Sequence, residues 1–549
     1  MRNFYQNRYF QAVFIGIGFF LFFTLLSSRD YMAVDGSTRC LNVSYSKEVF
    51  FHGNNHMLYP VHVFFWHKLL GLIGVKATSR LEYMHLTALM NALAGAGVLA
   101  IVYSLLRLII ESFRYTLAIT SCYAFSRAFL LHATNSTEPM VGLFWSILAI
   151  CILVFALNRS YSRLIFFTGF LLALSMATYQ SMVLIAPATV VLCFYWSNKE
   201  PIKKSTLFLR LCYLITGSVL GVASIYGYAY YTSGTQDIKS MVVRFFAVSG
   251  DSIYGSLTLR KFISLPLQFI RNVFPIMPGD FSGIVGWAVD NLNEKWWYWA
   301  YLVYGLVLLL IIKTIFYFWQ TNNQMNWKEK LAIWSAIIGV LFPLLANAYW
   351  FPGYDKLWLQ PNLCLILALG ILVKQVVKDS KDSKDSKKVF LPIVFLILAL
   401  EIFSNLVWLI PSRYQENQAL RGAEEVSKVV QSPPDLVIDG WDFVSLLYGA
   451  LWSYHIYNFH SAVEARGVAV LDELPKLIEE TKKRGGKVYF LGVLNETESS
   501  WSWFLASRGL PYNSLDPYRQ KARLVKHFKF SAFESSLYVL DFDSDKSTK

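Results

Sequence analysis

Charged side chains are scarce in this chain of 549 residues, because only 16% are Asp, Glu, Lys or Arg. A soluble domain carries about 25% of these residues, so the composition excludes an ordinary soluble protein. Hydrophobic residues reach 55% and aromatic residues 17%, which indicates a membrane protein. The net charge of +14 does not indicate nucleic-acid binding, since the basic residues cluster in short loops between apolar runs.

Cysteine is also rare, with six residues in the chain. All except Cys40 lie in apolar runs, where they are expected to pack as small apolar side chains. We therefore expect no disulfide within the chain. A cleavage site is missing too, since Ser27-Ser28-Arg29-Asp30 follows the first apolar run and is a poor one, so the first span should stay uncleaved.

Apolar runs of about 17–25 residues, long enough to cross a bilayer, number about eleven. We expect these spans near residues 10–28, 85–106, 115–132, 139–157, 163–178, 181–197, 209–231, 297–319, 331–349, 357–374 and 389–411. The pair 163–178 and 181–197 is separated only by the short hinge Tyr179-Gln180. The charged repeat 378–388 has no apolar residue to bury and is expected to be a mobile linker.

Charge predicts the orientation of these spans. Lys and Arg recur in the segments placed inside, from Arg2 and Arg8 to Lys387 and Lys388, whereas the short outer turns hold only Lys356. This asymmetry places the N-terminus in the cytoplasm. An odd number of spans then places the C-terminal region outside.

Three outer regions follow from this topology, at residues 29–84, 232–296 and 412–549. The first contains Leu58–Gly74, an interrupted apolar stretch that indicates a helix lying along the outer leaflet. The second contains an amphipathic stretch around 257–277. The third contains three strand-like runs, at 434–439, 487–493 and 536–541, with a helix-like run at 471–483, which together predict a small α/β domain.

Two acids stand at predicted outer ends of spans. Asp35 follows the first span, where a carboxylate is not needed for packing, and its alternative is a solvated loop acid. Glu138 precedes the fourth span, next to Pro139. The same stretch can be a helix start in which Asn135 or Ser136 caps and Glu138 complements the helix dipole. The functional alternative is a second acid in the cavity of Asp35, since ionisable residues at membrane depth are functional candidates.

A metal site is not indicated. His52, His56, His62 and His67 are irregularly spaced, and Gly53-Asn54-Asn55 is turn chemistry that keeps the first two rings off one helix face. The acids at 541–545 lie at the chain end, where disorder is the default. No adjacent carboxylate pair stands in the first outer loop, because Asp30 and Asp35 are separated in the sequence.

Basic side chains recur in the outer loops, where a lipid phosphate or pyrophosphate would need donors. Any single one can instead be a headgroup contact or a snorkelling anchor. The candidates are Arg39, Lys47, Arg80, Arg244, Arg260, Lys261, Arg271 and Lys356.

The order of features resembles the GT-C superfamily of polyprenyl-phosphate-sugar-dependent glycosyltransferases. It is most similar to the branch with protein O-mannosyltransferases and the lipid A aminoarabinose transferase. The resemblance rests on residues 1–200, with 200–411 matching in topology. It is carried by Asp35 after the first span, His56-Met-Leu-Tyr59-Pro60, Leu70-Gly71, Ser79-Arg80-Leu81, the acid Glu138 after His132, Phe170–Gln180 and Tyr354-Asp-Lys356-Leu-Trp-Leu-Gln-Pro361.

This resemblance implies a GT-C-like transmembrane domain over 1–411. It does not cover residues 412–549, which are expected from their own strand-like and helix-like runs and from the odd number of spans to form an extracytoplasmic α/β domain. It implies a multi-pass protein of the inner or cytoplasmic membrane that moves a sugar from a polyprenyl-phosphate carrier to a hydroxyl acceptor by inversion, without metal or other cofactor. Asp35 would be the general base, with Glu138 as a second catalytic residue. Substrate binding would fall to Arg39, His56, Tyr59, Arg80, His132, Arg244, Arg260, Lys261, Arg271, Tyr354 and Lys356. The sequence does not identify the acceptor, which could be a protein, a lipid or a glycan.

Two other functions stay open. A lipid-linked sugar transporter or flippase would predict charges through the span interiors and an internal repeat. The sequence shows few such charges, chiefly Arg127 and Glu401, and no repeat. A polysaccharide polymerase or ligase would share the substrates without this order of loops.

Overall fold

The protein is described by a computed structural model. It covers residues 7–27, 43, 56–195, 204–233, 259–273, 325–349, 355–382, 395–396, 398–403, 418–430, 434–440, 455–459, 462–463, 467–494, 505, 509–529 and 534–541. The chain divides into two compact units. The first, called here the membrane unit, comprises Met1–Ser28, Lys47–Lys76 and His85–Tyr414. The second, called the sheet unit, comprises Arg29–Ser46, Ala77–Met84 and Gln415–Lys549. The boundary expected at 411/412 stays a prediction.

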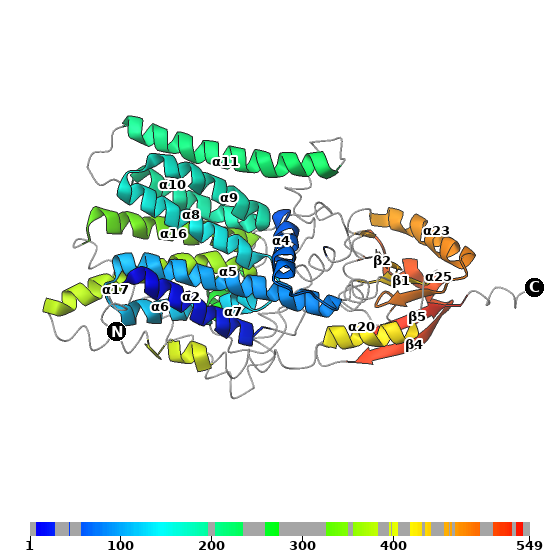
Figure 1. The fold of residues 1–549 in the computed structure, drawn as a ribbon. Helices are drawn as coiled ribbons and strands as arrows, with labels where there is room; N and C mark the ends of the chain where they lie inside the picture. The colour runs from blue at the N-terminus through cyan, green and yellow to red at the C-terminus, as the bar shows by residue number, and fades with distance from the viewer. Residues whose placement is uncertain are drawn as a thin grey trace, which may run out of the picture. The chain divides into compact units, whose positions relative to one another are not determined.

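Helices form the described part of the membrane unit (Figure 1), and the first residues of α5, up to Met84, belong to the sheet unit. In chain order they are α2 (Arg8–Leu25), α4 (Leu58–Leu72), α5 (Arg80–Ile109), α6 (Phe113–Phe125), α7 (Arg127–Ala133), α8 (Pro139–Arg159), η1 (Ser162–Leu164), α9 (Ile165–Thr178), η2 (Gln180–Ile185), α10 (Ala186–Tyr195), α11 (Lys204–Ser233), α13 (Leu259–Val273), α16 (Trp327–Tyr349), η4 (Asp355–Trp358) and α17 (Leu359–Asp382).

Six helices of the described residues are long and apolar enough to cross a membrane. They are Arg8–Leu25, Glu82–Ile109, Pro139–Arg159, Lys204–Tyr228, Glu329–Tyr349 and Lys356–Lys374. Ser162–Thr178 and Gln180–Cys193 are shorter apolar helices, and they correspond to the expected pair that meets at Tyr179. The expected span 297–319 and most of 389–411 lie outside the described residues, so the number eleven stays a prediction.

Two expectations about helix limits are wrong. The span expected at 115–132 is interrupted at Ser126, whose extended backbone (ψ 140°) separates α6 from α7. Its hydroxyl donates to the Tyr123 carbonyl at 2.8 Å, so the side chain competes with the helical ladder. The linker expected from Lys378 is helical as far as Asp382, because extending an existing helix by residues such as Lys costs little.

Local sequence fixes where α8 begins and ends. Pro139 is its first residue, a position where a missing N–H costs nothing. Its last residue, Arg159, is followed by Ser160 with φ 58°, a left-handed helix end. At about 1.5 Å per residue, α8 is roughly 30 Å long, so its two ends lie in different surroundings.

Close backbone contact joins α9 to α11. A Cβ built on Gly169 would lie 2.2 Å from the Leu214 carbonyl oxygen, and one built on Gly217 would lie 2.0 Å from the Phe166 carbonyl oxygen. Small residues allow such approach between helices in a membrane, where packing replaces the hydrophobic driving force. Elsewhere buried hydroxyls link helices, as where Ser175 of α9 donates to the Gly142 carbonyl at 2.7 Å.

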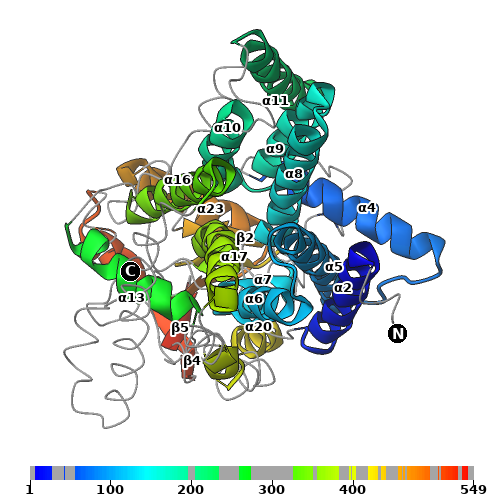
Figure 2. The ribbon, with the colours of Figure 1, turned by 90° about the vertical axis from the view of Figure 1, so that its left-hand side faces the viewer.

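Helix α17 packs between α16 and α6 in the membrane unit (Figure 2). The apolar core there includes fully buried Phe129, Leu143 and Trp358. Tyr123 of α6 donates its hydroxyl to the Leu359 carbonyl at 2.9 Å, which ties the start of α17 to the core. In contrast to the long helices, α4 runs across their direction (Figure 1). This direction agrees with the expected interfacial helix, whose place in a membrane stays a prediction.

A five-stranded sheet is the centre of the sheet unit, with the order β2-β1-β3-β5-β4. The elements are α20 (Gln418–Val429), β1 (Leu436–Asp439), β2 (His455–Asn458), η6 (Gly467–Ala469), α23 (Val470–Lys483), β3 (Val488–Leu491), η7 (Tyr512–Leu515), α25 (Asp516–Arg519), β4 (Ala522–Lys529) and β5 (Glu534–Leu540). β1 pairs in parallel with β2 and β3, whereas β5 pairs antiparallel with β3 and β4. The three strands and the helix expected from the sequence are therefore confirmed, and α23 forms the crossover that a parallel pair requires.

Candidate functional site

Glu138 is almost completely buried at the start of α8, with 1% of its surface exposed. It occupies the N-cap position, and its own side chain makes no capping hydrogen bond to α8. A buried carboxylate is costly unless a charge or a dipole compensates it. The helix N-terminus supplies one compensation, and a histidine supplies a second.

That histidine is His56, whose Nε2 lies 3.6 Å from Glu138 Oε1. The distance exceeds that of a hydrogen bond, so the contact is electrostatic and depends on the protonation of the ring. His56 lies two residues before the start of α4, and its carbonyl accepts from the amide of buried Tyr59 at 3.2 Å. The first turn of α4 thus holds His56 in place.

Side chains anchor α4 to its neighbours. The Trp145 indole of α8 donates to His62 Nε2 at 3.0 Å, so His62 Nδ1 carries the proton that is donated to the Leu58 carbonyl at 2.6 Å. On the next turn, Trp66 donates to the Leu86 carbonyl at 2.7 Å. Burial lowers the pKa of His62, which fits its acceptor role toward Trp145. These bonds fix the helix that presents His56.

Tyr179 connects the histidine to a lysine. Its ring stacks on His56, with centroids 4.8 Å apart and an interplanar angle of 25°. The Lys356 ammonium lies 5.7 Å from the same ring centroid, within the range of a cation–π contact. Tyr179 has extended backbone between α9 and η2, and this break in the helix turns its side chain toward the cluster.

Glu138, His56, Tyr179 and Lys356 together form a cluster that we call the outer-end cluster. Lys356 belongs to η4, which the buried Trp358 anchors. The sequence indicated three of the four residues as candidates. It did not indicate Tyr179, which was weighed only as a hinge. The available signal was an aromatic residue at the break between two apolar runs.

Polar contacts also shape the turn before Glu138. His132 is buried, and its Nδ1 lies 2.9 Å from the Thr137 hydroxyl. The Asn91 amide of α5 donates to the carbonyls of Asn135 at 2.5 Å and Thr137 at 2.6 Å. These contacts give His132 and Asn91 a positioning part, because they hold the backbone that presents Glu138. The predicted contact of His132 with substrate stays a prediction.

The remaining candidates are less fully described. Lys261 on α13 donates to the Tyr349 carbonyl at 3.1 Å, at the end of α16, and partial desolvation lowers its pKa. Arg80 begins α5, and Arg260 and Arg271 belong to α13, but their side chains lie outside the description. Asp35, Arg39, Arg244 and Tyr354 lie outside the described residues.

The outer-end cluster combines an acid, an imidazole and an ammonium in a largely water-excluded place. An ammonium can bind a phosphate, and an acid–imidazole pair can hold or move a proton. Among the residues that the structure describes, no three His, Cys, Asp or Glu side chains stand close enough to hold a metal ion. The cluster therefore has the chemistry of anion binding and proton handling.

Comparison with solved structures identifies the fold. The crystal structure of ArnT from Cupriavidus metallidurans bound to undecaprenyl phosphate matches with a TM-score of 0.55 and 9% identity, covering 96% of this chain and 97% of that chain. The apo crystal structure of the same protein matches with a TM-score of 0.45 and 10% identity, covering the same shares. No family model matches this chain, and no curated protein sequence matches it either. The fold expected from the sequence is thus confirmed by the similarity to ArnT, and the six long apolar helices agree with an integral membrane protein.

Proposed function

We propose that this protein is a GT-C-type glycosyltransferase that moves a hexose or pentose from a polyprenyl phosphate to a hydroxyl acceptor. The observation that supports this most is the outer-end cluster, in which Lys356 and the Glu138–His56 pair meet around one aromatic ring. The cluster is set in the fold of ArnT, and ArnT has been crystallised with undecaprenyl phosphate. Lipid phosphate and a transferable proton are the two groups that such a cluster would serve.

The proposed reaction is a single inverting displacement. The acceptor oxygen attacks the anomeric carbon, and the bond from that carbon to the phosphate oxygen breaks. The lipid phosphate leaves with the bonding electron pair, and the acceptor proton goes to the Asp35 carboxylate. Lys356 stabilises the charge that grows on the phosphate, with Arg39, Arg80, Arg244, Arg260, Lys261 and Arg271 as the further proposed donors.

Glu138 has the second proposed part, as a buried acid that faces the imidazole of His56. A buried acid that only completed a helix N-terminus would be replaceable by glutamine with little loss. The observed pairing with His56 at 3.6 Å favours an acid whose charge matters. No divalent metal is proposed to take part.

The sheet unit is proposed to lie outside the cytoplasm and to shape the entrance of the acceptor, with a passive appendage as the alternative. Protease added to right-side-out vesicles should then cut after Arg413. Cutting only in inverted vesicles would show that the number of spans is wrong by one.

The direct test is turnover by the purified protein with a panel of polyprenyl-phosphate sugars. Each reaction would contain one sugar donor and one acceptor class, whether a lipid extract, a glycan or a peptide. Released polyprenyl phosphate together with a glycosylated acceptor supports the proposal. Movement of the intact donor across proteoliposomes without phosphate release would instead identify a transporter, and extension of a glycan chain would identify a polymerase or ligase.

A further inference from the structure

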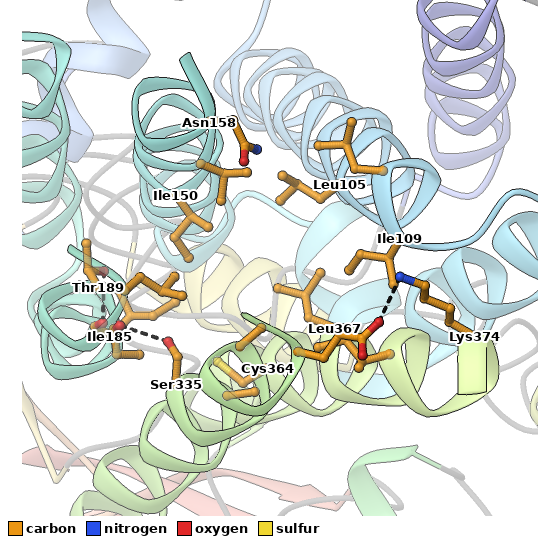
Figure 3. Close-up of a pocket in the computed structure, with 18 of the residues that line it drawn as sticks. Leu105, Ile109, Ile150, Asn158, Ile185, Thr189, Ser335, Cys364, Leu367 and Lys374 are labelled. Atoms are coloured by element: carbon orange, nitrogen blue, oxygen red, sulfur yellow. Dashed lines mark hydrogen bonds and ion pairs between the residues drawn. The ribbon is translucent and has the colours of Figure 1, made fainter. Parts of the chain in front are cut away.

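A cavity of about 300 Å³ is lined by residues of α5, α8, α10, α16 and α17 (Figure 3), and its wall includes Asn158, at the end of α8 opposite to Glu138. We call it the inner-end cavity. It lies where α5 and α8 finish and α16 begins, and its wall includes Ile109, Asn158 and Glu329. Asn158 and Glu138 lie at the two ends of α8, roughly 30 Å apart at about 1.5 Å per residue, whereas the lining residue Ile150 is roughly 18 Å from Glu138 along the same helix. None of the four residues of the outer-end cluster lines the cavity, so the two sites are distinct.

The wall of the inner-end cavity is graded from apolar to charged. Ile150, Ile185 and Leu367 line its apolar part, and Lys374 lies at its polar part (Figure 3). Lys374 Nζ forms an ion pair with Glu329 Oε1 at 2.8 Å. The cavity also opens to the surface, since its lining residue Leu108 is 59% exposed. An apolar interior with an ammonium at the mouth has the chemistry of an amphiphile with an anionic head.

The surroundings favour a membrane lipid as the occupant. This end of the bundle is the one that charge asymmetry places on the cytoplasmic side, and it also carries Arg159 and Lys330. Basic pockets between helices on that side bind anionic headgroups. A volume of about 300 Å³ has room for roughly ten methylene groups, if each is taken to occupy about as much as a water molecule, ~30 Å³.

The ion pair of Lys374 and Glu329 at the mouth of the cavity is held in place by further hydrogen bonds. Glu329 Oε2 accepts from the Asn326 amide at 3.1 Å, and the Glu329 amide donates to Asn326 Oδ1 at 3.0 Å. This reciprocal cap fixes Glu329 and, through it, Lys374. An ammonium has three N–H donors, so the bond to Glu329 leaves donors for a phosphate, and the side chain of Lys374 is 40% exposed.

We propose that the inner-end cavity binds one acyl chain of an anionic phospholipid, whose phosphate contacts Lys374. Packing of the chain fills a space whose walls otherwise lack partner atoms. Apolar walls do not distinguish lipids, because lipid tails are as apolar as the side chains. The selectivity therefore comes from the ammonium, and the proposal stands whether or not the protein is a glycosyltransferase.

Native mass spectrometry of the purified full chain tests this proposal without an activity assay. The probes are phosphatidylglycerol and phosphatidylethanolamine with identical chains. We expect phosphatidylglycerol to be retained in preference, and Lys374→Gln to lower that retention about fivefold, the factor that corresponds to one Lys at a charged membrane surface. Lys330→Gln is the matched control, since it removes the same charge from the same end outside the cavity wall, and it should change retention less than twofold.

Filling the cavity tests the acyl chain separately. Ala336→Phe should lower the retention of both lipids, and Ala332→Leu, at a less buried position of the same wall, gives a second variant if the first does not fold. Equal retention of both lipids, or unchanged retention in Lys374→Gln, would overturn the headgroup contact. Unchanged retention in the filled variants would overturn the chain site. Displacement of phosphatidylglycerol by equimolar polyprenyl phosphate would assign the cavity to the sugar carrier instead.

Discussion

Lys356 and Lys374 bracket one apolar helical segment, yet their surroundings differ. At the outer end, Lys356 lies over the Tyr179 ring, next to the buried Glu138–His56 pair. At the inner end, Lys374 pairs with Glu329 beside an apolar cavity. In the sequence both lysines look like anchors at a membrane surface.

The difference comes from backbone that other elements bring to each lysine. At the outer end, the extended residue Tyr179 and the turn before Glu138 direct polar side chains inward. At the inner end, a regular helix start supplies Glu329, which is held by its own cap. Irregular backbone between membrane helices is tolerated where protein buries it or where it lines a cavity. Irregular backbone between the helices therefore indicates which end of the bundle is the better candidate for a catalytic site.

The largest expected loss of turnover is at Asp35. This loss would assign the general base to the outer end of the helices. Asp35→Asn should lower kcat about 10²–10⁴-fold, the range for loss of a general base, because an amide cannot take the acceptor proton. Donor binding should be retained. Asp30→Asn is the matched control in the same loop and should keep its turnover. Near-normal release of polyprenyl phosphate by Asp35→Asn would refute the assignment.

The second-largest loss of turnover is expected at Lys356. This variant tests directly whether Lys356 and Lys374 have different functions. Lys356→Gln should lower turnover about 10²-fold, as loss of one stabilising donor does, while phosphatidylglycerol retention stays unchanged. Tyr179→Phe keeps the ring under the ammonium and should cost far less than Tyr179→Leu. Equal losses in the two Tyr179 variants would show that the hydroxyl, rather than the ring, is what matters.

A smaller loss of turnover is expected at Glu138. Here a role in the reaction and a role in stabilising the start of α8 predict different results. Glu138→Gln should lower turnover about tenfold by removing the negative charge, with about 0.3–1 kcal/mol lost in stability from the helix dipole. Since His56 faces the same carboxylate, a combined His56→Gln, Glu138→Gln variant should lose less than the sum of the single losses in free energy. Additive losses would show that the two residues act independently.

His62 gives the outer end a dependence on pH. Because burial holds the pKa of His62 below the usual value of about 6.5, the unfolded chain takes up the proton first as the pH falls. The stabilisation is complete above pH 6.5 and is lost as the pH falls through 6.5 toward the folded pKa, by roughly 1.4 kcal/mol per pH unit. Thermal unfolding at pH 7.5 and 5.5 measures this loss. His62→Gln, which can keep both hydrogen bonds without titrating, should show a smaller difference between the two pH values.

Sequence patterns predicted the regular parts of this molecule well. Long apolar runs indicated the helices, and β1, β3 and β5 were indicated by short runs of buried residues. β4 was not, because it is a mostly exposed edge strand, and its Lys526 pairs with Glu425. A charged, solvated strand has no apolar alternation to detect.

The candidate site was predictable only in part. Asp35, Glu138 and Lys356 were selected because an ionisable side chain at the end of an apolar run is a candidate for function. Tyr179 did not, because an aromatic residue in a chain with 17% aromatics is unremarkable until its neighbours are known. The break at Ser126 was also missed, since the sequence does not show that the Ser126 hydroxyl bonds to the Tyr123 carbonyl and competes with the helical ladder.

The smallest expected effect is that of a metal chelator, which should leave turnover unchanged. The motive is chemical: a site for a divalent ion needs several ligands converging on one point. Two of the histidines near the outer end already have partners, His62 with the Leu58 carbonyl and Trp145, and His67 with the Thr87 hydroxyl at 2.9 Å. Glu138 faces the imidazole of His56 at 3.6 Å. Stabilisation of the leaving phosphate would then rest on Lys356 and the other basic side chains. Turnover measured with and without EDTA, and again after adding back Mg²⁺, Mn²⁺ or Zn²⁺, tests this. Loss in the chelator with recovery by one of these ions would move phosphate stabilisation from the lysine to a metal.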